Sequence, residues 1–284
     1  MTTVQPVRRI ILTVLDGLRP DAIGAFGLTH IARLARAGCA SFDAQTVSPG
    51  MTAAAMATLF SGVAPRVHGI TSDRFHLPRP TSPLVLLPRV LADHGLPTSG
   101  FCAEMPVYAR PLARTIARHL GVGNPSFAGN SAPEILMSAN GALQQQRTGL
   151  IFLHWPDADR AGHEHGWMSP LYARAARRLD GALGLLAALV GLESDEGTIL
   201  IALSDHGGGG RDPRSHDSDH PADRSIFMLV GGRAVARGEM APCTSLLDVA
   251  PTILHALGLP IPAAWEGRAL VEAVALNEPV RATG

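Results

Sequence analysis

Short apolar runs alternate along the chain with longer stretches whose apolar positions recur at a helical period. The short runs predict strands over Arg9–Leu15, Thr98–Cys102, Gly149–His154, Thr198–Leu203 and Ser225–Val230. The longer stretches predict helices over Thr29–Ala37, Thr52–Phe60, Leu84–His94, Ala132–Gln146, Pro170–Val190 and Leu246–Leu257. This alternation favours an α/β fold with a mostly parallel central sheet between layers of helices. The breaks between elements are short, so we expect one domain over residues 1–284.

Carboxylates and imidazoles directly follow three of the predicted strands. Asp16 ends the first strand, Asp157 and Asp159 follow the third, and Asp205 and His206 follow the fourth. In open α/β sheets, ligands bind beyond the carboxyl ends of the strands, so we expect these groups to share one edge. Carboxylates gathered there repel one another unless protons or cations intervene.

Composition narrows the possible functions. The chain has a formal net charge of zero, which gives no sign of a nucleic-acid or anionic membrane partner. It contains no lysine, which excludes a lysine-dependent mechanism, and its three cysteines are too far apart for a thiolate zinc knuckle. The sequence shows neither a signal peptide nor an apolar run of about 18 residues, so we expect a cytoplasmic protein. No pattern specifies an oligomeric state.

The spacing of the Asp and His residues indicates two metal half-sites. Asp159 and His163 form one, and a further histidine from the loop after Asp205 would complete it. Asp16, Asp205 and His206 form the other. Mixed Asp/His sets suit zinc, manganese or iron better than calcium. Two neighbouring cations are a common device for phosphoryl transfer.

Thr52 is the candidate nucleophile. It follows a Pro-Gly turn and stands in the first turn of an alanine-rich predicted helix. A helix N-terminus favours bound phosphate, and a coordinated hydroxyl there ionises more readily. The alternative for this stretch alone is that Thr52 only caps the helix.

Four blocks of the chain resemble the alkaline phosphatase superfamily, and most closely its nucleotide pyrophosphatase/phosphodiesterase branch, over residues 9–269. They are "ILTVLDGLRPD", "SPGMTAAAMATLFSGVAPRVHGI", "DRAGHEHG" and "LSDHG". The resemblance implies one metal held by Asp159, His163 and His216, with Asp157 and His220 as alternates. It implies a second metal held by Asp16, Asp205, His206 and the Thr52 oxygen. Zinc is the expected metal, with manganese as the alternative.

The implied reaction is in-line attack of the Thr52 oxygen on a small-molecule phosphoester, followed by hydrolysis with overall retention. Members of the resembled branch usually have the sequence T-F-P-N at the nucleophile, with an asparagine shortly after the threonine. Here Thr52 is followed by three alanines, so that asparagine, one donor to the phosphoryl oxygen, is missing. With no lysine and no arginine obviously fixed beside Thr52, a diester is favoured over a monoester, unless Arg19 or Arg66 folds inward.

Several alternatives stay open. They are a phosphomonoesterase of the same fold and a metal-holding binding protein without catalysis. A sulfatase or a phosphoglycerate mutase-like enzyme fits the sequence around Thr52 less well. We expect residues 154–167 to form a metal-binding loop and His154 to be a surface or core histidine.

Overall fold

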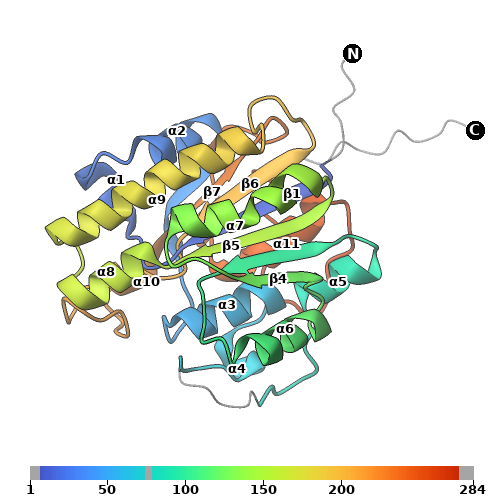
Figure 1. The fold of residues 1–284 in the computed structure, drawn as a ribbon, viewed down its shortest axis with the longest axis horizontal. Coiled ribbons are helices and arrows are strands. Elements are labelled where there is room, and N and C mark those ends of the chain that lie inside the picture. Colours follow the sequence, from blue (N-terminus) through green and yellow to red (C-terminus); the bar gives the residue numbers. More distant parts are fainter. Residues whose placement is uncertain (1–6, 74–78, 275–284) are drawn as a thin grey trace, which may run out of the picture.

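The computed structural model describes residues 7–73 and 79–274, which are built around one eight-stranded sheet (Figure 1). The strands are β1 Arg9–Leu15, β2 Cys39–Gln45, β3 Thr98–Cys102, β4 Asn124–Phe127, β5 Gly149–Trp155, β6 Thr198–Leu203, β7 Ser225–Gly231 and β8 Gly238–Glu239. Their order across the sheet is β4-β3-β5-β1-β6-β7-β2-β8. The central strand β1 is parallel to β5 and β6, and only β7 runs antiparallel to its neighbours. The predicted mostly parallel α/β sheet is confirmed.

Helices cover both faces of the sheet (Figure 1). They are α1 Pro20–Ala25, α2 Thr29–Ala37, α3 Thr52–Ser61, α4 Pro65–His68, α5 Leu87–Asp93, α6 Arg110–His119, α7 Ala132–Gln145, α8 Asp157–His165, α9 Pro170–Leu189, α10 Pro221–Arg224 and α11 Val249–Ala256, with a 3-10 turn at Leu246–Asp248. Ile11 and Leu15 of β1 pack with α2, α7 and α9, whereas Leu12 packs with α3, α5 and α11. None of the helices in the described ranges is long and apolar enough to cross a membrane.

The predicted strands and helices all form, with shifts only at their ends. The strands β2, β4 and β8 were not predicted. In β2 the sequence "CASFDAQ" places exposed Phe42 and Asp43 side by side, and the pairing with β7 shifts register between Ser41 and Ala44. This irregularity breaks the alternation by which a half-buried strand is recognised.

Residues 154–167 do not form the expected loop. Most of the segment is α8. Only Asp157, Ala158 and Gly162 are buried in this helix, so its sequence lacks the apolar periodicity by which a helix is predicted. Gly162 allows the indole of Trp167 to approach closely, since a Cβ there would lie 2.5 Å from the ring. Helical geometry places residues four apart on one face, which is the separation of the two half-site residues that α8 supplies.

Candidate metal centre and nucleophile

The level ends of β1, β5 and β6 bring Asp16, His154 and Asp205 to one edge of the sheet. A turn at Gly17, with φ of 67°, follows Asp16 and admits the backbone of Asp159, because a Cβ on Gly17 would lie 2.8 Å from Asp159 Cα. The N–H of Asp159 donates to the Asp16 carbonyl at 2.9 Å, and the N–H of Gly17 donates to Asp205 Oδ1 at 3.3 Å. The first bond ties α8 to the end of β1, and the second ties the turn after β1 to Asp205, shortly after β6.

His163, His206 and His216 present the same ring nitrogen to this edge. Each Nδ1 lies beside a backbone carbonyl, which can only accept, so Nδ1 carries the proton and Nε2 faces inward. The carbonyls belong to Arg214, Gly207 and Gly50, at 2.8, 2.9 and 2.8 Å respectively. Burial, reinforced by the charge of His206, lowers the pKa of His216 to about 4, so that ring is neutral at pH 7. Carbonyl-oriented imidazoles of this kind are typical of metal-binding histidines.

Oδ1 of Asp159 lies among the three Nε2 atoms. Its distances are 3.4 Å to His163, 3.7 Å to His216 and 3.9 Å to His206. Asp16 joins the same cluster, with Oδ1 3.2 Å from Nε2 of His206 and Oδ2 3.1 Å from Nε2 of His154. The structure therefore brings together every residue of the two half-sites predicted from the sequence.

Four polar atoms of this cluster are buried and, in the described part of the chain, make ion-pair contacts but no hydrogen bond of normal geometry. They are Asp16 Oδ1, His154 Nε2, Asp159 Oδ1 and Asp205 Oδ2. An unpaired buried polar group costs about 1–3 kcal/mol. Carboxylate oxygens and imidazole nitrogens together are suitable donors for a divalent cation, which would satisfy these atoms at once. The residues present therefore fit a metal centre.

Gathering these carboxylates at one buried edge shifts their pKa values. Burial, reinforced by the charge of Asp16, raises the pKa of Asp159 to about 8 and that of Asp205 to about 6. Burial also opposes ionisation of Asp16, but the imidazoles of His154 and His206 outweigh it and hold the pKa of Asp16 well below its usual range. The pKa of His206 is raised well above its usual value because the carboxylates outweigh its burial. Protons take up the excess negative charge that cations would otherwise neutralise.

Thr52 stands beside this cluster as the first residue of α3. Its Oγ1 lies 3.2 Å from Nε2 of His206. The N-cap of α3 is Met51, so the interpretation of Thr52 as a simple capping residue does not match the structure. The next amide, of Ala53, donates to Oδ1 of Asp73 at 2.8 Å. The hydroxyl of Thr52 is thus directed at the candidate ligands.

Asp157, the alternate to Asp159, performs a different task. Its Oδ2 accepts a 2.7 Å hydrogen bond from the N–H of Ala132, at the start of α7. Its Oδ1 pairs with Arg178 of α9 at 3.2 Å, and its side chain is 2% exposed. These contacts join α7, α8 and α9, and they leave Asp159 as the aspartate of α8 that reaches the cluster.

His220, the alternate to His216, is also engaged elsewhere. It is the N-cap of α10, where its Nδ1 accepts from the N–H of Ala222 at 3.1 Å. His220 is exposed, whereas His216 is buried beside Asp159. The geometry places His216 at the cluster.

His154, expected to be a surface or core histidine, lies among the candidate ligands. It ends β5 beside Asp16, and it forms a group of possible ligands with Asp16 and Asp205. Its one sequence signal was its place at the end of an apolar run. The register that sets β5 level with β1 depends on the whole sheet and could not be read from that run.

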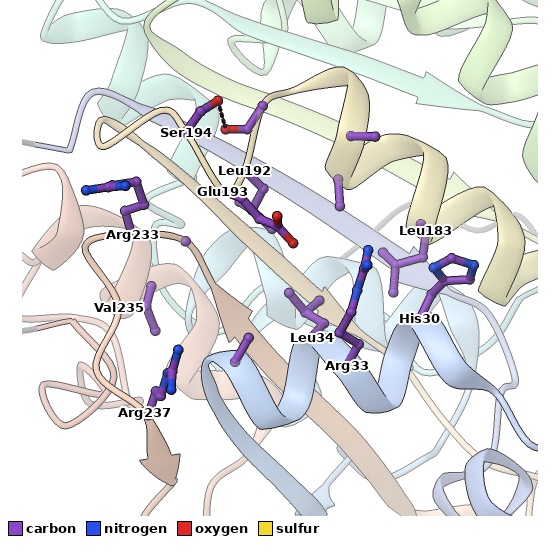
Figure 2. A pocket seen from close by; sticks show the side chains of 16 residues that line it. His30, Arg33, Leu34, Leu183, Leu192, Glu193, Ser194, Arg233, Val235 and Arg237 are labelled. Atoms are coloured by element: carbon purple, nitrogen blue, oxygen red, sulfur yellow. Dashed lines mark hydrogen bonds between the residues drawn. The ribbon is translucent and has the colours of Figure 1, made fainter.

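A groove of about 780 Å³ lies away from this edge, between α2, the end of α9 and the segment after β7 (Figure 2). Its lining includes Arg33 and His30 of α2 and, across the groove, Arg233 and Arg237. It lies where β7 ends and the loop before β6 begins, and none of the candidate ligands lines it. The candidate chemistry is therefore separate from this groove.

Comparisons with known proteins agree with this architecture. The human ectonucleotide pyrophosphatase/phosphodiesterase 5 superposes with a TM-score of 0.70 at 14% identity, covering 94% of this chain and 99% of that one. A 2-O GAG sulfatase superposes with a TM-score of 0.68 at 14% identity, covering 94% of this chain and 73% of that one. The 2,3-bisphosphoglycerate-independent phosphoglycerate mutase of Synechococcus sp. is 30% identical over 154 residues, or 50% of this chain. This chain spans 28% of the length of that mutase.

The family model and the mutase match support a phosphoryl-transfer enzyme of the alkaline phosphatase superfamily, whose members are metal-dependent. Within that superfamily, the model of the type I phosphodiesterase / nucleotide pyrophosphatase family matches residues 10–84 and 103–237. The chain belongs to this family.

Proposed function

We propose that this protein is a two-metal phosphodiesterase that hydrolyses small-molecule phosphodiesters or nucleotide pyrophosphates with Thr52 as nucleophile. The observation that carries the proposal is the position of Thr52 Oγ1, 3.2 Å from His206 in a cluster of unpaired ligand atoms. Asp159, His163 and His216 would hold one cation. Asp16, Asp205, His206 and Thr52 would hold the other, with His154 adjoining this second set. The Asp/His donors favour zinc, with manganese as the alternative.

Thr52 would act in two steps. Its oxygen forms a bond to phosphorus as the bond to the leaving-group oxygen breaks, which gives a covalent threonine adduct. Water then attacks phosphorus from the opposite side, the bond to Thr52 breaks, and the hydroxyl is restored. Two in-line displacements give overall retention of configuration. The bound cations would supply positive charge that favours the ionised threonine oxygen and the charge on the reacting oxygens.

The surroundings of Thr52 favour a substrate with a single negative charge. Arg66 is exposed and pairs with Glu266. Arg19 pairs with Asp21 and donates to the carbonyl of Gly208 at 3.0 Å. Both of the arginines that could have folded toward the nucleophile are thus engaged elsewhere. Neither arginine is therefore available to neutralise the second negative charge of a phosphomonoester.

The test compares wild-type protein with Thr52→Ala and Thr52→Ser on bis-p-nitrophenyl phosphate, after chelation and reloading with zinc or manganese. We expect metal-dependent turnover that falls by on the order of 10³-fold or more in Thr52→Ala, and partial activity in Thr52→Ser. Thr115→Ala, at an exposed threonine of α6, is the matched control and should keep full activity. Equal activity in wild type and Thr52→Ala contradicts the proposed nucleophile.

The matching mutase supports a second candidate, in which Thr52 transfers the phosphoryl group to another hydroxyl rather than to water. A mutase should release little phosphate yet exchange label between two positions of a phosphorylated sugar or glycerate. A phosphomonoesterase should instead prefer p-nitrophenyl phosphate. A metal-holding binding protein should take up metal and turn over none of these substrates.

A further inference from the structure

The first turn of α3, which carries Thr52, is hydrogen-bonded to an acidic side chain of the same chain. Asp73 Oδ1 accepts a 2.8 Å hydrogen bond from the N–H of Ala53, the residue directly after Thr52. Asp73 is exposed. A negative charge therefore stands beside the candidate nucleophile.

This position matters because the start of α3 is well suited to receive a phosphoryl oxygen. The N-cap residue Met51 makes no side-chain hydrogen bond to the helix, so amides of the first turn are available to outside acceptors. A helix N-terminus also favours anions. The carboxylate of Asp73 takes one of these amides and adds a full negative charge at the place a phosphoester must reach.

The two arginines considered as partners of the nucleophile pair with carboxylates other than Asp73. Arg66 pairs with Glu266, and the guanidinium of Arg19 is held by Asp21. Within residues 7–73 and 79–274 no ion pair joins Asp73 to an arginine, and Arg74, which directly follows Asp73, lies outside these ranges. An approaching phosphoester therefore meets Asp73 as a like charge.

We propose that Asp73 is a specificity-determining residue that disfavours dianionic phosphomonoesters relative to monoanionic phosphodiesters. The inference rests on the proposed function of the same site. A monoester carries a second negative charge above a pH of about 6, and Asp73 repels that extra charge. A role confined to capping α3 would change stability, and it would affect both substrate classes alike.

The test uses Asp73→Asn, which keeps an oxygen that can accept from Ala53 but removes the charge. The ratio of kcat/KM for p-nitrophenyl phosphate to that for bis-p-nitrophenyl phosphate should rise about 3- to 10-fold at low salt, and less at about 0.5 M salt. Asp73→Ser is a second uncharged variant in case Asp73→Asn folds poorly. Glu196→Gln, which removes a charge before β6 at the opposite edge of the sheet, should leave the ratio unchanged.

Calorimetry on the metal-loaded protein gives a second readout that needs no turnover. Inorganic phosphate at pH 8 should bind Asp73→Asn about 3- to 10-fold more tightly than wild type, with a smaller gain for dimethyl phosphate. Equal changes for both anions and both esters, or a change in Tm alone, would overturn the role of Asp73. Selective tightening of phosphate without turnover of any ester would support Asp73 and reject the proposed function.

Discussion

Asp157 and Asp159 differ by two positions in α8, yet their substitution should have opposite effects on the metal-free protein. In Asp157→Asn, one amide oxygen replaces two carboxylate oxygens that accept from Ala132 and pair with Arg178. Loss of one such charged contact at a helix start costs about 1–2 kcal/mol of unfolding free energy. No cluster atom is touched, so the stabilisation that zinc gives should persist.

Asp159→Asn removes an acid that folding of the metal-free protein forces to take up a proton. The pKa of Asp159 is raised to about 8 by burial and then by Asp16, and its side chain is 16% exposed. At pH 7 the folded acid stays protonated while the unfolded one is ionised, which costs the metal-free fold on the order of 4 kcal/mol relative to an exposed aspartate. The neutral amide removes this cost, so the metal-free variant should be about 1–3 kcal/mol more stable than wild type.

Urea unfolding at pH 7, with chelator and then with zinc at about 100 times its Kd, measures both effects. Zinc should stabilise wild type and Asp157→Asn by about 2.7 kcal/mol. It should stabilise Asp159→Asn by less than about 1 kcal/mol, because a ligand is lost. The reasoning is refuted if Asp157→Asn loses the zinc effect while Asp159→Asn keeps it.

Two further predictions concern buried groups away from the metal centre. Arg9 is 1% exposed and donates to the carbonyls of Leu143 and Val190 at the ends of α7 and α9. Arg9→Met should therefore lower the unfolding free energy by about 2–4 kcal/mol in urea titrations. An unchanged urea midpoint would refute that role. His68 is fully buried, its Nδ1 accepts from the N–H of Ile70 at 3.1 Å, and burial lowers its pKa. Its contribution to stability is therefore present above the unfolded pKa of about 6.5 and is lost as pH falls. His68→Asn should lose less stability than wild type between pH 7 and pH 5, and parallel pH profiles would contradict this.

The sequence predicted the parts of the fold that depend on long apolar runs. The strands β1 and β6 are wholly buried, so their near-continuous apolar sequences are distinctive. By contrast, α8 has a polar surface and a narrow buried face, and its helical state depends on packing against α9 and on Gly162 meeting Trp167. Local periodicity could not show either contact.

The candidate site was predicted in the same uneven way. Asp16, Asp205 and His206 directly follow apolar strands, so parallel-sheet topology alone brought them to one edge. The choice between Asp157 and Asp159 required the contacts of Asp157 with α7 and α9, which are distant in sequence. Asp73 was not recognised because its contact with Ala53 joins residues 20 positions apart, across α3, α4 and the turns that follow them.

The most direct test of a threonine-based phosphoryl transfer is to trap the covalent adduct. Zinc-loaded protein is mixed with bis-p-nitrophenyl phosphate, quenched in acid within the first turnover and digested for peptide mass spectrometry. If Thr52 is the nucleophile, a phosphoester forms on Thr52 in wild type and none forms in Thr52→Ala. Turnover with an adduct on another residue, or phosphoester transfer that Thr52→Ala still performs at the wild-type rate, would contradict this role of Thr52.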